Sequence, residues 1–374
     1  MKVGILTFFR PINNGAVLQA CATNRIVLQR LGIESELIDY RLPRIEYYRK
    51  CFYLKEVFMR AGFKEKLRGI ASNVLFFPLK YKRKKHFDKF IAKYLITSKR
   101  VYKSLDQLKQ ECNDYDAYMV GSDLVWNPIM SDGVNPVYFL EFVNGQKKIA
   151  YAPSIGSVDI NKGDLKEIAK KAEGLDSISL REKTSVEQLQ CYVNKNIHTV
   201  LDPTLLTYSD DWDDFYSDKP LYKEKYIFAF VLEQSDLLIN TVNMLASQYN
   251  CPVVTSSEKN SFKAKKVINV KYNLGPSEFL NTIKNAKVVV TNSFHGCAFS
   301  VIFHKDFYCI PHTTRGIRMI DMMKSFMIDD RIISNNEKPV STEIDYQKVE
   351  TIRKNALKQS MNYLSNALLG NDYE

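Results

Sequence analysis

The chain opens with an apolar stretch that predicts a strand over residues 2–8, followed by a polar turn over 10–15. Apolar positions then recur at helical spacing over residues 16–31, and Gly32 is suited to end that helix. Residues 33–40 predict a second strand. This βαβ opening is typical of α/β domains, but it lacks the GxGxxG pattern of dinucleotide-binding proteins.

Four further strands are predicted before residue 210, and each ends in polar or turn residues. Their sequences are YDAYMVGSD, KKIAYAPSIG, DSISLRE and HTVLDPTLL. The polar ends are Ser122-Asp123, Pro153-Ser154, Arg181-Glu182 and Asp202-Pro203. Open α/β sheets bind ligands at the carboxyl ends of their strands, so this repetition predicts a ligand crevice there.

The acidic, aromatic stretch 208–225 predicts a loop, and we place the domain boundary in it. A second alternating unit follows, with strands in YIFAFVLE, CPVVTSS, KKVINVKY, KVVVTNSFHG and DFYCIP and a helix starting at Pro276. Residues 346–369 predict one long helix, which could pack back on the first domain. The predicted fold is α/β, with domains 1–210 and 211–374 facing a cleft.

The segment KVVVTNSFHG, residues 287–296, is the most informative part of the chain. A buried parallel strand delivers a histidine to a turn, and the next residues can start a helix at once. Asn292, Ser293 and His295 would then lie where backbone N–H groups and a helix dipole converge, which predicts an anion site with a proton donor. A histidine satisfied within the core is the structural alternative.

Composition narrows the class of protein. The 374 residues include seven cysteines, an odd number without a CxxC pair, which argues against a disulfide framework or a structural zinc. The five histidines show no metal-ligand spacing, so we predict no metal. No signal peptide or spanning segment is evident, so we expect a cytoplasmic protein, or one peripheral to the inner face of the cytoplasmic membrane.

The net charge of +11 is concentrated in residues 41–100, where 18 Lys/Arg face 4 Asp/Glu among many aromatic residues. This pattern predicts an amphipathic helical insertion that contacts an anionic membrane surface or a phosphate-bearing acceptor. A solvated helical face with snorkelling lysines is the alternative. No nucleic-acid-binding signature accompanies the charge, so we expect no nucleic-acid partner.

Cations outnumber carboxylates among the residues expected in the cleft, which favours an anionic ligand. Arg315 and Arg318 lie one helical turn apart, and the arginine fork suits carboxylate or phosphate. The expected residues are Arg181, His295, Lys305, Arg315 and Arg318, with Asp123 and Asn14 from the first half.

Several of these segments together resemble the polysaccharide pyruvyltransferase family. The matching segments are ILTFFRPINNGAVLQA, YDAYMVGSDLVWNP, KIAYAPSIGS, SLREKTS, LDPTLL and VVVTNSFHGCAFSVIF, in that order. The resemblance implies two Rossmann-like domains of the GT-B glycosyltransferase type. It also implies transfer of pyruvate from phosphoenolpyruvate onto two hydroxyls of a sugar as a cyclic ketal, with no cofactor besides this donor.

By the same resemblance, the second domain would bind the donor. His295 would be the general acid, since histidine titrates near neutral pH, and Arg181 would clamp the phosphate or carboxylate. Arg315 and Arg318 would assist. Asn292, Ser293 and Gly296 would complete the anion pocket.

Acceptor recognition would fall to the first domain, through Asn14-Gly15 and Ser122-Asp123 together with Trp126. Asp123 would orient or deprotonate a sugar hydroxyl, unless it only caps a helix. Trp126 would stack on a sugar ring, unless it only packs in the core. Asn14 and Leu124 depart from the family pattern on this acceptor side.

A nucleotide-sugar-dependent GT-B glycosyltransferase is the main alternative, because it would share the architecture. Such enzymes often bind the donor ribose with a carboxylate, but the only glutamates between Cys251 and Ser325 are Glu258 and Glu278, both distant from TNSFHG. A membrane scaffold would leave His295 without a role. We therefore expect a hexose acceptor in a cell-surface polysaccharide or its lipid-linked precursor.

Overall fold

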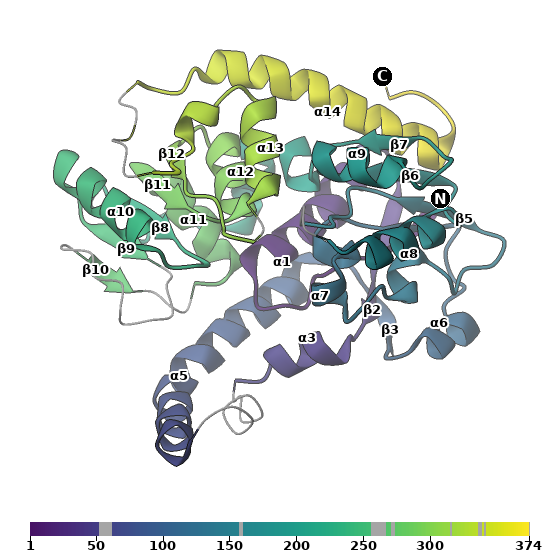
Figure 1. Cartoon of the computed structure of the whole chain (residues 1–374), viewed down its shortest axis with the longest axis horizontal. Helices are drawn as coiled ribbons and strands as arrows, with labels where there is room; N and C mark the ends of the chain where they lie inside the picture. Colours follow the sequence, from purple (N-terminus) through teal and green to yellow (C-terminus); the bar gives the residue numbers. More distant parts are fainter. Residues whose placement is uncertain are drawn as a thin grey trace.

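A computed structural model describes most of the chain, namely residues 1–51, 62–156, 160–255, 267–270, 274–314, 316–335, 339 and 342–373. It contains a seven-stranded and a five-stranded parallel sheet (Figure 1). The first sheet has the order β3-β2-β1-β4-β5-β6-β7. Its strands are β1 (Lys2–Leu6), β2 (Glu34–Tyr40), β3 (Thr97–Tyr102), β4 (Ala117–Val120), β5 (Lys147–Ala150), β6 (Ser177–Leu180) and β7 (Ile197–Thr199).

The first helical stretch differs from the uniform helix predicted over 16–31. It begins earlier, because the Asn13 side chain accepts hydrogen bonds from the backbone N–H groups of Gly15 and Ala16. It then runs as α1 (Asn14–Cys21), a π-helical segment (Ala22–Val27) and α2 (Leu28–Arg30). Further helices of this domain include α6 (Leu105–Glu111), α7 (Pro128–Ser131), α8 (Lys162–Ala172) and α9 (Lys183–Gln190).

The second sheet has the order β10-β9-β8-β11-β12. Its strands are β8 (Ile227–Phe230), β9 (Val253–Thr255), β10 (Val267–Val270), β11 (Val288–Thr291) and β12 (Asp306–Cys309). Its helices are α10 (Asp236–Gln248), α11 (Pro276–Asn285), α12 (Phe294–Ile302), α13 (Ile317–Ser325) and α14 (Tyr346–Leu369). Both sheets place the first strand of the unit between its second and fourth, which is the Rossmann order. The prediction of two Rossmann-like domains in a GT-B-like fold is confirmed.

The last helix, α14, spans both sheets (Figure 1). The Tyr363 hydroxyl donates to the carbonyl of Ala150 at the end of β5, at 2.8 Å. Arg353 in the same helix donates to the carbonyls of Leu205 and Thr207, which follow β7. The chain therefore ends by joining the second sheet to the first.

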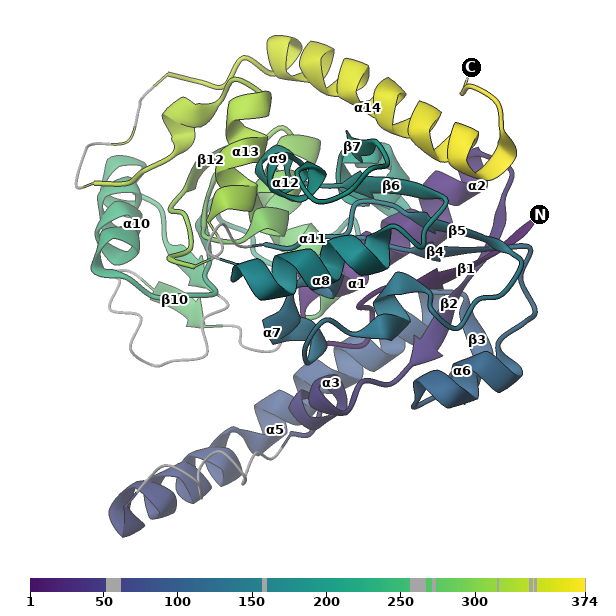
Figure 2. The ribbon, with the colours of Figure 1, turned by 45° about the vertical axis from the view of Figure 1, so that its right-hand side comes forward.

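The basic segment forms α3 (Pro43–Tyr48) and the 32-residue helix α5 (Phe63–Tyr94), whose first half projects from the body of the protein (Figure 2). Its second half is anchored in the main core by Phe87 and Phe90, which are 0% and 3% exposed. The predicted insertion 41–100 runs too far, because Thr97–Tyr102 is the edge strand β3 of the first sheet. Among the described helices, none is both long and apolar enough to cross a membrane.

Candidate active site

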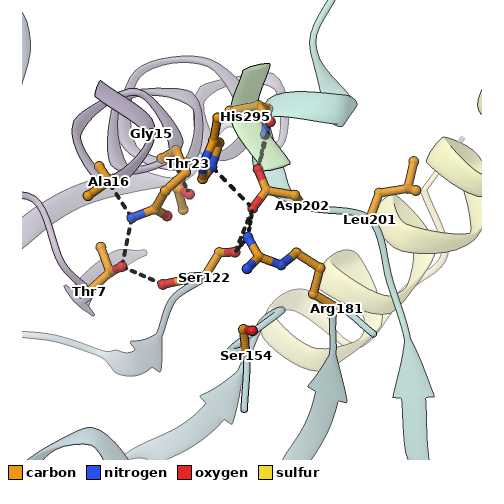
Figure 3. Close-up of polar contacts among 12 residues, drawn as sticks. Thr7, Gly15, Ala16, Thr23, Ser122, Ser154, Arg181, Leu201, Asp202 and His295 are labelled. Atoms are coloured by element: carbon orange, nitrogen blue, oxygen red, sulfur yellow. Dashed lines mark hydrogen bonds and ion pairs between the residues drawn. The ribbon is translucent and has the colours of Figure 1, made fainter. Parts of the chain in front are cut away.

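Side chains from both domains meet where the carboxyl ends of the two sheets face each other (Figure 3). Arg181 directly follows β6, and Asp202 follows β7. His295 comes from the second domain, in the first turn of α12 after β11. The parallel topology brings these residues together, since strand ends of one sheet share an edge.

Asp202 is the centre of this cluster and is completely buried. One carboxylate oxygen accepts from the Ser122 hydroxyl at 2.8 Å and from Arg181 Nη1 at 2.6 Å. It also lies 3.8 Å from Nε2 of His295. The other oxygen accepts from the backbone N–H and the hydroxyl of Thr204. Burial alone would raise the pKa of Asp202, but His295, Arg181 and the Thr204 hydrogen bonds lower it to about 2.

His295 is 5% exposed, and its Nε2 has no hydrogen-bond partner among the described residues. Burial lowers its pKa to about 4; Asp202 and Asp123 oppose this shift, and Arg181 and Arg318 add to it. A histidine with this pKa is neutral at pH 7. His295 lines a cavity, and its buried nitrogen without a partner does not fit the alternative of a satisfied core histidine.

Arg181 has a side chain that is only 2% exposed and is already held by carboxylates. Its Nε donates to Glu182 at 3.2 Å and its Nη1 to Asp202, while the guanidinium carbon lies 4.3 Å from the ring centroid of Phe294. Burial would lower its pKa, but Glu182 and Asp202 raise it overall. Nη2 is buried and has no hydrogen-bond partner among the described residues. Arg181 lines a cavity of about 200 Å³ together with Asp202 and Arg318, and it is not among the residues that line the larger cavity next to His295.

A cavity of about 460 Å³ opens beside this cluster. His295, Ser293 and Arg318 line it from the second domain, and Asp123 lines it from the first. Arg44, Lys80 and Arg83 of α3 and α5 also line it, and the sequence pointed to them only as part of the basic segment 41–100. The volume is within the range of small-molecule sites.

The residues predicted to bind the acceptor fall in different places. Asp123 lines the cavity, caps no helix with its side chain and has a φ of 75°, a conformation that is rare outside glycine. Ser122 is buried against Asp202. Asn14 is 2% exposed at the start of α1.

The prediction that Trp126 stacks on a sugar ring disagrees with the structure. The indole is 2% exposed, stacks on Phe139 and donates from Nε1 to the carbonyl of Tyr138 at 2.8 Å. A buried indole needs a hydrogen-bond partner, and Trp126 finds it inside the first domain. Core packing is the interpretation that fits.

Among the residues predicted to bind the donor, Ser293, His295 and Arg318 line the cavity, while Arg315 lies outside the described residues. The Asn292 side chain hydrogen-bonds to the backbone that follows β8. It accepts from the N–H of Leu232 and donates to the carbonyl of Glu233. Gly296 packs against Thr291, where an added Cβ would clash with the threonine hydroxyl.

The sequence predicted Lys305 to lie in the cleft, but the structure places it elsewhere. It precedes β12, and its Nζ donates to the carbonyl of Lys284 at 2.8 Å. β11 and β12 are parallel neighbours, so their amino ends lie at one edge of the sheet and their carboxyl ends at the other. Lys305 precedes β12 and His295 follows β11, so the two residues lie at opposite edges. Conversely, Asp202 was recognised only as a polar strand end, although the same signal had singled out Arg181.

No group of three or more His, Cys, Asp or Glu side chains among the described residues could hold a metal ion. The side chains described above supply hydrogen-bonding and charged groups to the site. Its basic character, with one histidine lacking a partner, suits an anionic ligand and a proton transfer.

Comparisons with solved structures extend over nearly the whole chain at low identity. The UDP-GlcNAc 2-epimerase of Methanocaldococcus jannaschii is 12% identical, with a TM-score of 0.49, and covers 97% of this chain and 94% of its own. The E. coli heptosyltransferase WaaC is 9% identical, with a TM-score of 0.38, and the match covers 95% of this chain and 99% of the heptosyltransferase. A search of curated proteins finds no match.

The fold and the cavity between its domains define a two-domain GT-B-like protein. The sequence pattern of the polysaccharide pyruvyl transferase family matches residues 13–314, which include His295, Arg181 and Asp202. The chain therefore belongs to the polysaccharide pyruvyl transferase family and is a transferase.

Gly15→Ala should separate the two domains locally. An added Cβ at Gly15 would overlap Nδ1 of His295, so α1 and α12 must move apart or the imidazole must turn. We expect a loss of about 1–3 kcal/mol in the free energy of unfolding, together with a marked loss of activity. Urea denaturation and turnover assays measure both. Gly62→Ala is the matched control, because its Cβ would meet open space, and equal effects in both variants would refute the steric argument.

The buried imidazole predicts a specific pH dependence of stability. As pH falls, His295 in the unfolded chain, with a pKa near 6.5, binds a proton at a higher pH than His295 in the folded chain, where its pKa is about 4. Stability contributed by neutral His295 is therefore complete above pH 6.5 and falls by about 3 kcal/mol as pH drops to 4. Urea denaturation of wild type and His295→Gln across this range should show a smaller loss in the variant. An identical pH profile in both proteins would contradict the pKa shift.

Proposed function

We propose that this protein transfers pyruvate from phosphoenolpyruvate to two hydroxyls of a hexose, forming a cyclic ketal. The observation that carries the proposal is His295, which lines a cavity together with cations from both domains and whose buried Nε2 has no hydrogen-bond partner among the described residues. In this proposal the second domain, 211–374, binds the donor and the first, 1–210, binds the acceptor. The reaction needs no cofactor besides the donor.

The charges around His295 suit the donor. Phosphoenolpyruvate carries a phosphate and a carboxylate, and Arg318, Ser293 and the start of α12 can receive them. An anion there would offset the positive charges of Arg181 and Arg318, which now lower the pKa of His295. Binding would thereby shift that pKa upward, although burial, the largest cause of its lowering, would remain. In the proposed reaction the imidazole carries a proton in the complex with the donor.

The chemistry balances with the residues that line the cavity. His295 gives its proton to the methylene carbon of phosphoenolpyruvate, and a sugar hydroxyl oxygen bonds to the adjacent carbon and loses its proton. Phosphate then leaves from that carbon, and the second hydroxyl oxygen takes its place and loses a proton to complete the ketal. Asp123, which lines the cavity from the first domain, would accept a hydroxyl proton.

The alternative of a nucleotide-sugar donor has less support. Glu278 forms an ion pair with His86 at 2.9 Å and accepts from the backbone N–H of Gly275, so it is committed to the contact between α11 and α5. Glu258 lies outside the described residues. Glu278 therefore gives no support to a ribose-binding role.

Ligand-induced stabilisation distinguishes these donors, because a ligand that binds only the folded state must raise its stability. Thermal unfolding should shift upward with phosphoenolpyruvate and remain unchanged with UDP- and GDP-sugars. His295→Ala should keep most of this shift and lose turnover, measured as phosphate release, by at least about 100-fold. Stabilisation by a nucleotide sugar alone would overturn the proposed donor.

We also propose that the acceptor is a lipid-linked precursor presented at the cytoplasmic face of a membrane. The projecting part of α5 exposes Val74 by 60%, Leu75 by 71% and Phe77 by 42%, and exposed Lys82 and Lys85 follow within three turns. Apolar side chains beside lysines suit insertion into an anionic bilayer surface. The same helix leads to the cavity.

Vesicle sedimentation tests the membrane contact. We expect the protein to bind vesicles containing phosphatidylglycerol, to bind phosphatidylcholine vesicles less, and to dissociate as salt rises. Leu75→Ser with Phe77→Ser should weaken binding about tenfold or more, whereas Ile129→Ser, which replaces a residue 65% exposed elsewhere, should not. Equal retention of both variants would contradict a contact through α5.

A further inference from the structure

A cavity of about 740 Å³ lies at the amino edge of the second sheet, opposite to the edge that carries His295. Lys225, Lys287 and Lys305 line it, and they come just before β8, β11 and β12. These three strands are parallel neighbours, so the residues that precede them meet at one edge of the sheet. The cavity is therefore separate from the candidate active site.

Four lysines bring positive charge to this cavity. Lys284, in the last turn of α11, is neutralised by Asp213, since their side chains form an ion pair at 2.9 Å. Lys225, Lys287 and Lys305 form no ion pair within the described part of the chain. Three ammonium groups thus converge on the cavity without a carboxylate in direct contact.

The other ionisable groups of the lining do not balance these three cations. The carboxylate of Asp306 accepts from the buried Arg331 at 2.8 Å, so its charge already has a partner. His304 lies 3.0 Å from Glu350. Glu343 is the remaining carboxylate among the described residues that line the cavity. One negative charge therefore faces three positive ones.

Lys305 is the least exposed of the three lysines, because Lys225 and Lys287 are exposed and Lys305 is half-buried. Its Nζ donates to the carbonyl of Lys284 at 2.8 Å, near the carboxyl end of α11. Burial lowers the pKa of Lys305, and the positive charges of Lys287 and Lys284 lower it further. A half-buried ammonium group among like charges is stabilised by an anion that binds beside it.

We infer that this cavity binds a small phosphate-bearing molecule through Lys225, Lys287 and Lys305. Lysine is a common phosphate ligand, and a phosphate monoester carries nearly two negative charges at pH 7. The cavity volume is in the range of small-molecule sites. The inference is independent of the proposed function, because the cavity lies at the other edge of the sheet from His295.

The lining favours a small molecule over the headgroup of a phospholipid. A surface that binds a membrane exposes large apolar side chains beside its cations. None of the described residues that line this cavity is an exposed large apolar residue, in contrast to Leu75 and Phe77 on α5. Charge is thus concentrated here without the apolar contact that a bilayer needs.

Limited acetylation with acetic anhydride at pH 8, followed by mass spectrometry, measures the reactivity of individual lysines in the intact protein. Inorganic phosphate is the probe, and sodium chloride at the same ionic strength is the reference. Bound phosphate favours the protonated, unreactive amine, so labelling of Lys287 and Lys305 should fall about fivefold or more. Labelling of Lys358 should not change, because Lys358 is exposed on α14 and does not line the cavity.

Lys287→Gln tests the site with little risk to folding, because Lys287 is exposed. In this variant, protection of Lys305 should require about tenfold more phosphate, roughly the loss of one charge-assisted contact. Lys358→Gln is the matched control and should protect Lys305 as the wild type does. An absence of protection, an equal loss of labelling at Lys358, or unchanged protection in Lys287→Gln would overturn the site.

Two further probes distinguish a small molecule from a membrane. Glycerol 3-phosphate and vesicles containing phosphatidic acid both present a phosphate monoester. Protection of Lys305 by glycerol 3-phosphate at a lower phosphate concentration than by vesicles supports the inference. Protection by vesicles at an equal or lower concentration would overturn it and assign this face to a phospholipid surface.

Discussion

The buried carboxylate of Asp202 is the interaction on which the site depends. It accepts from Arg181 and Ser122 of its own domain and faces His295 of the other, so it balances positive charge that burial would otherwise exclude. Without it, Arg181 would retain Glu182 as its one counter-charge in direct contact within the described part of the chain. The same carboxylate opposes the burial that lowers the pKa of His295. The pKa of His295, the catalytic histidine proposed here, therefore depends on charges of the other domain as well as on its own burial.

Close packing at the same boundary determines where His295 lies. Gly15 lets α1 approach the imidazole, and Gly296 lets α12 approach Thr291 at the end of β11. Two long helices also connect the domains, since α14 hydrogen-bonds to the end of β5 and α5 contacts α11 through His86 and Glu278. The geometry of the cavity thus follows from contacts between the domains, and small residues are required at its closest point.

The helix α5 combines three environments in one continuous element. Its C-terminal half is anchored by phenylalanines in the core, its middle turns direct Lys80 and Arg83 to the cavity, and its N-terminal half exposes apolar side chains. Pro78 lies inside this helix, between the exposed apolar side chains and Lys80. A surface that contacts the projecting half would thus be connected to the cavity by one helix, which is the arrangement a carrier-linked acceptor would need.

Local sequence patterns determined the alternation of strands and helices, because periodicity and capping act within a few residues. The long helix Tyr346–Leu369 and the start of α11 at Pro276 were predicted at their observed bounds. The carboxyl ends of strands also pointed to Arg181 and His295, since topology brings such ends together. Burial and partners were decided only by the tertiary structure. Asp202 became the centre of the cluster, Trp126 a core residue and Lys305 a residue of the opposite edge, because each outcome depends on segments distant in sequence that no local pattern encodes.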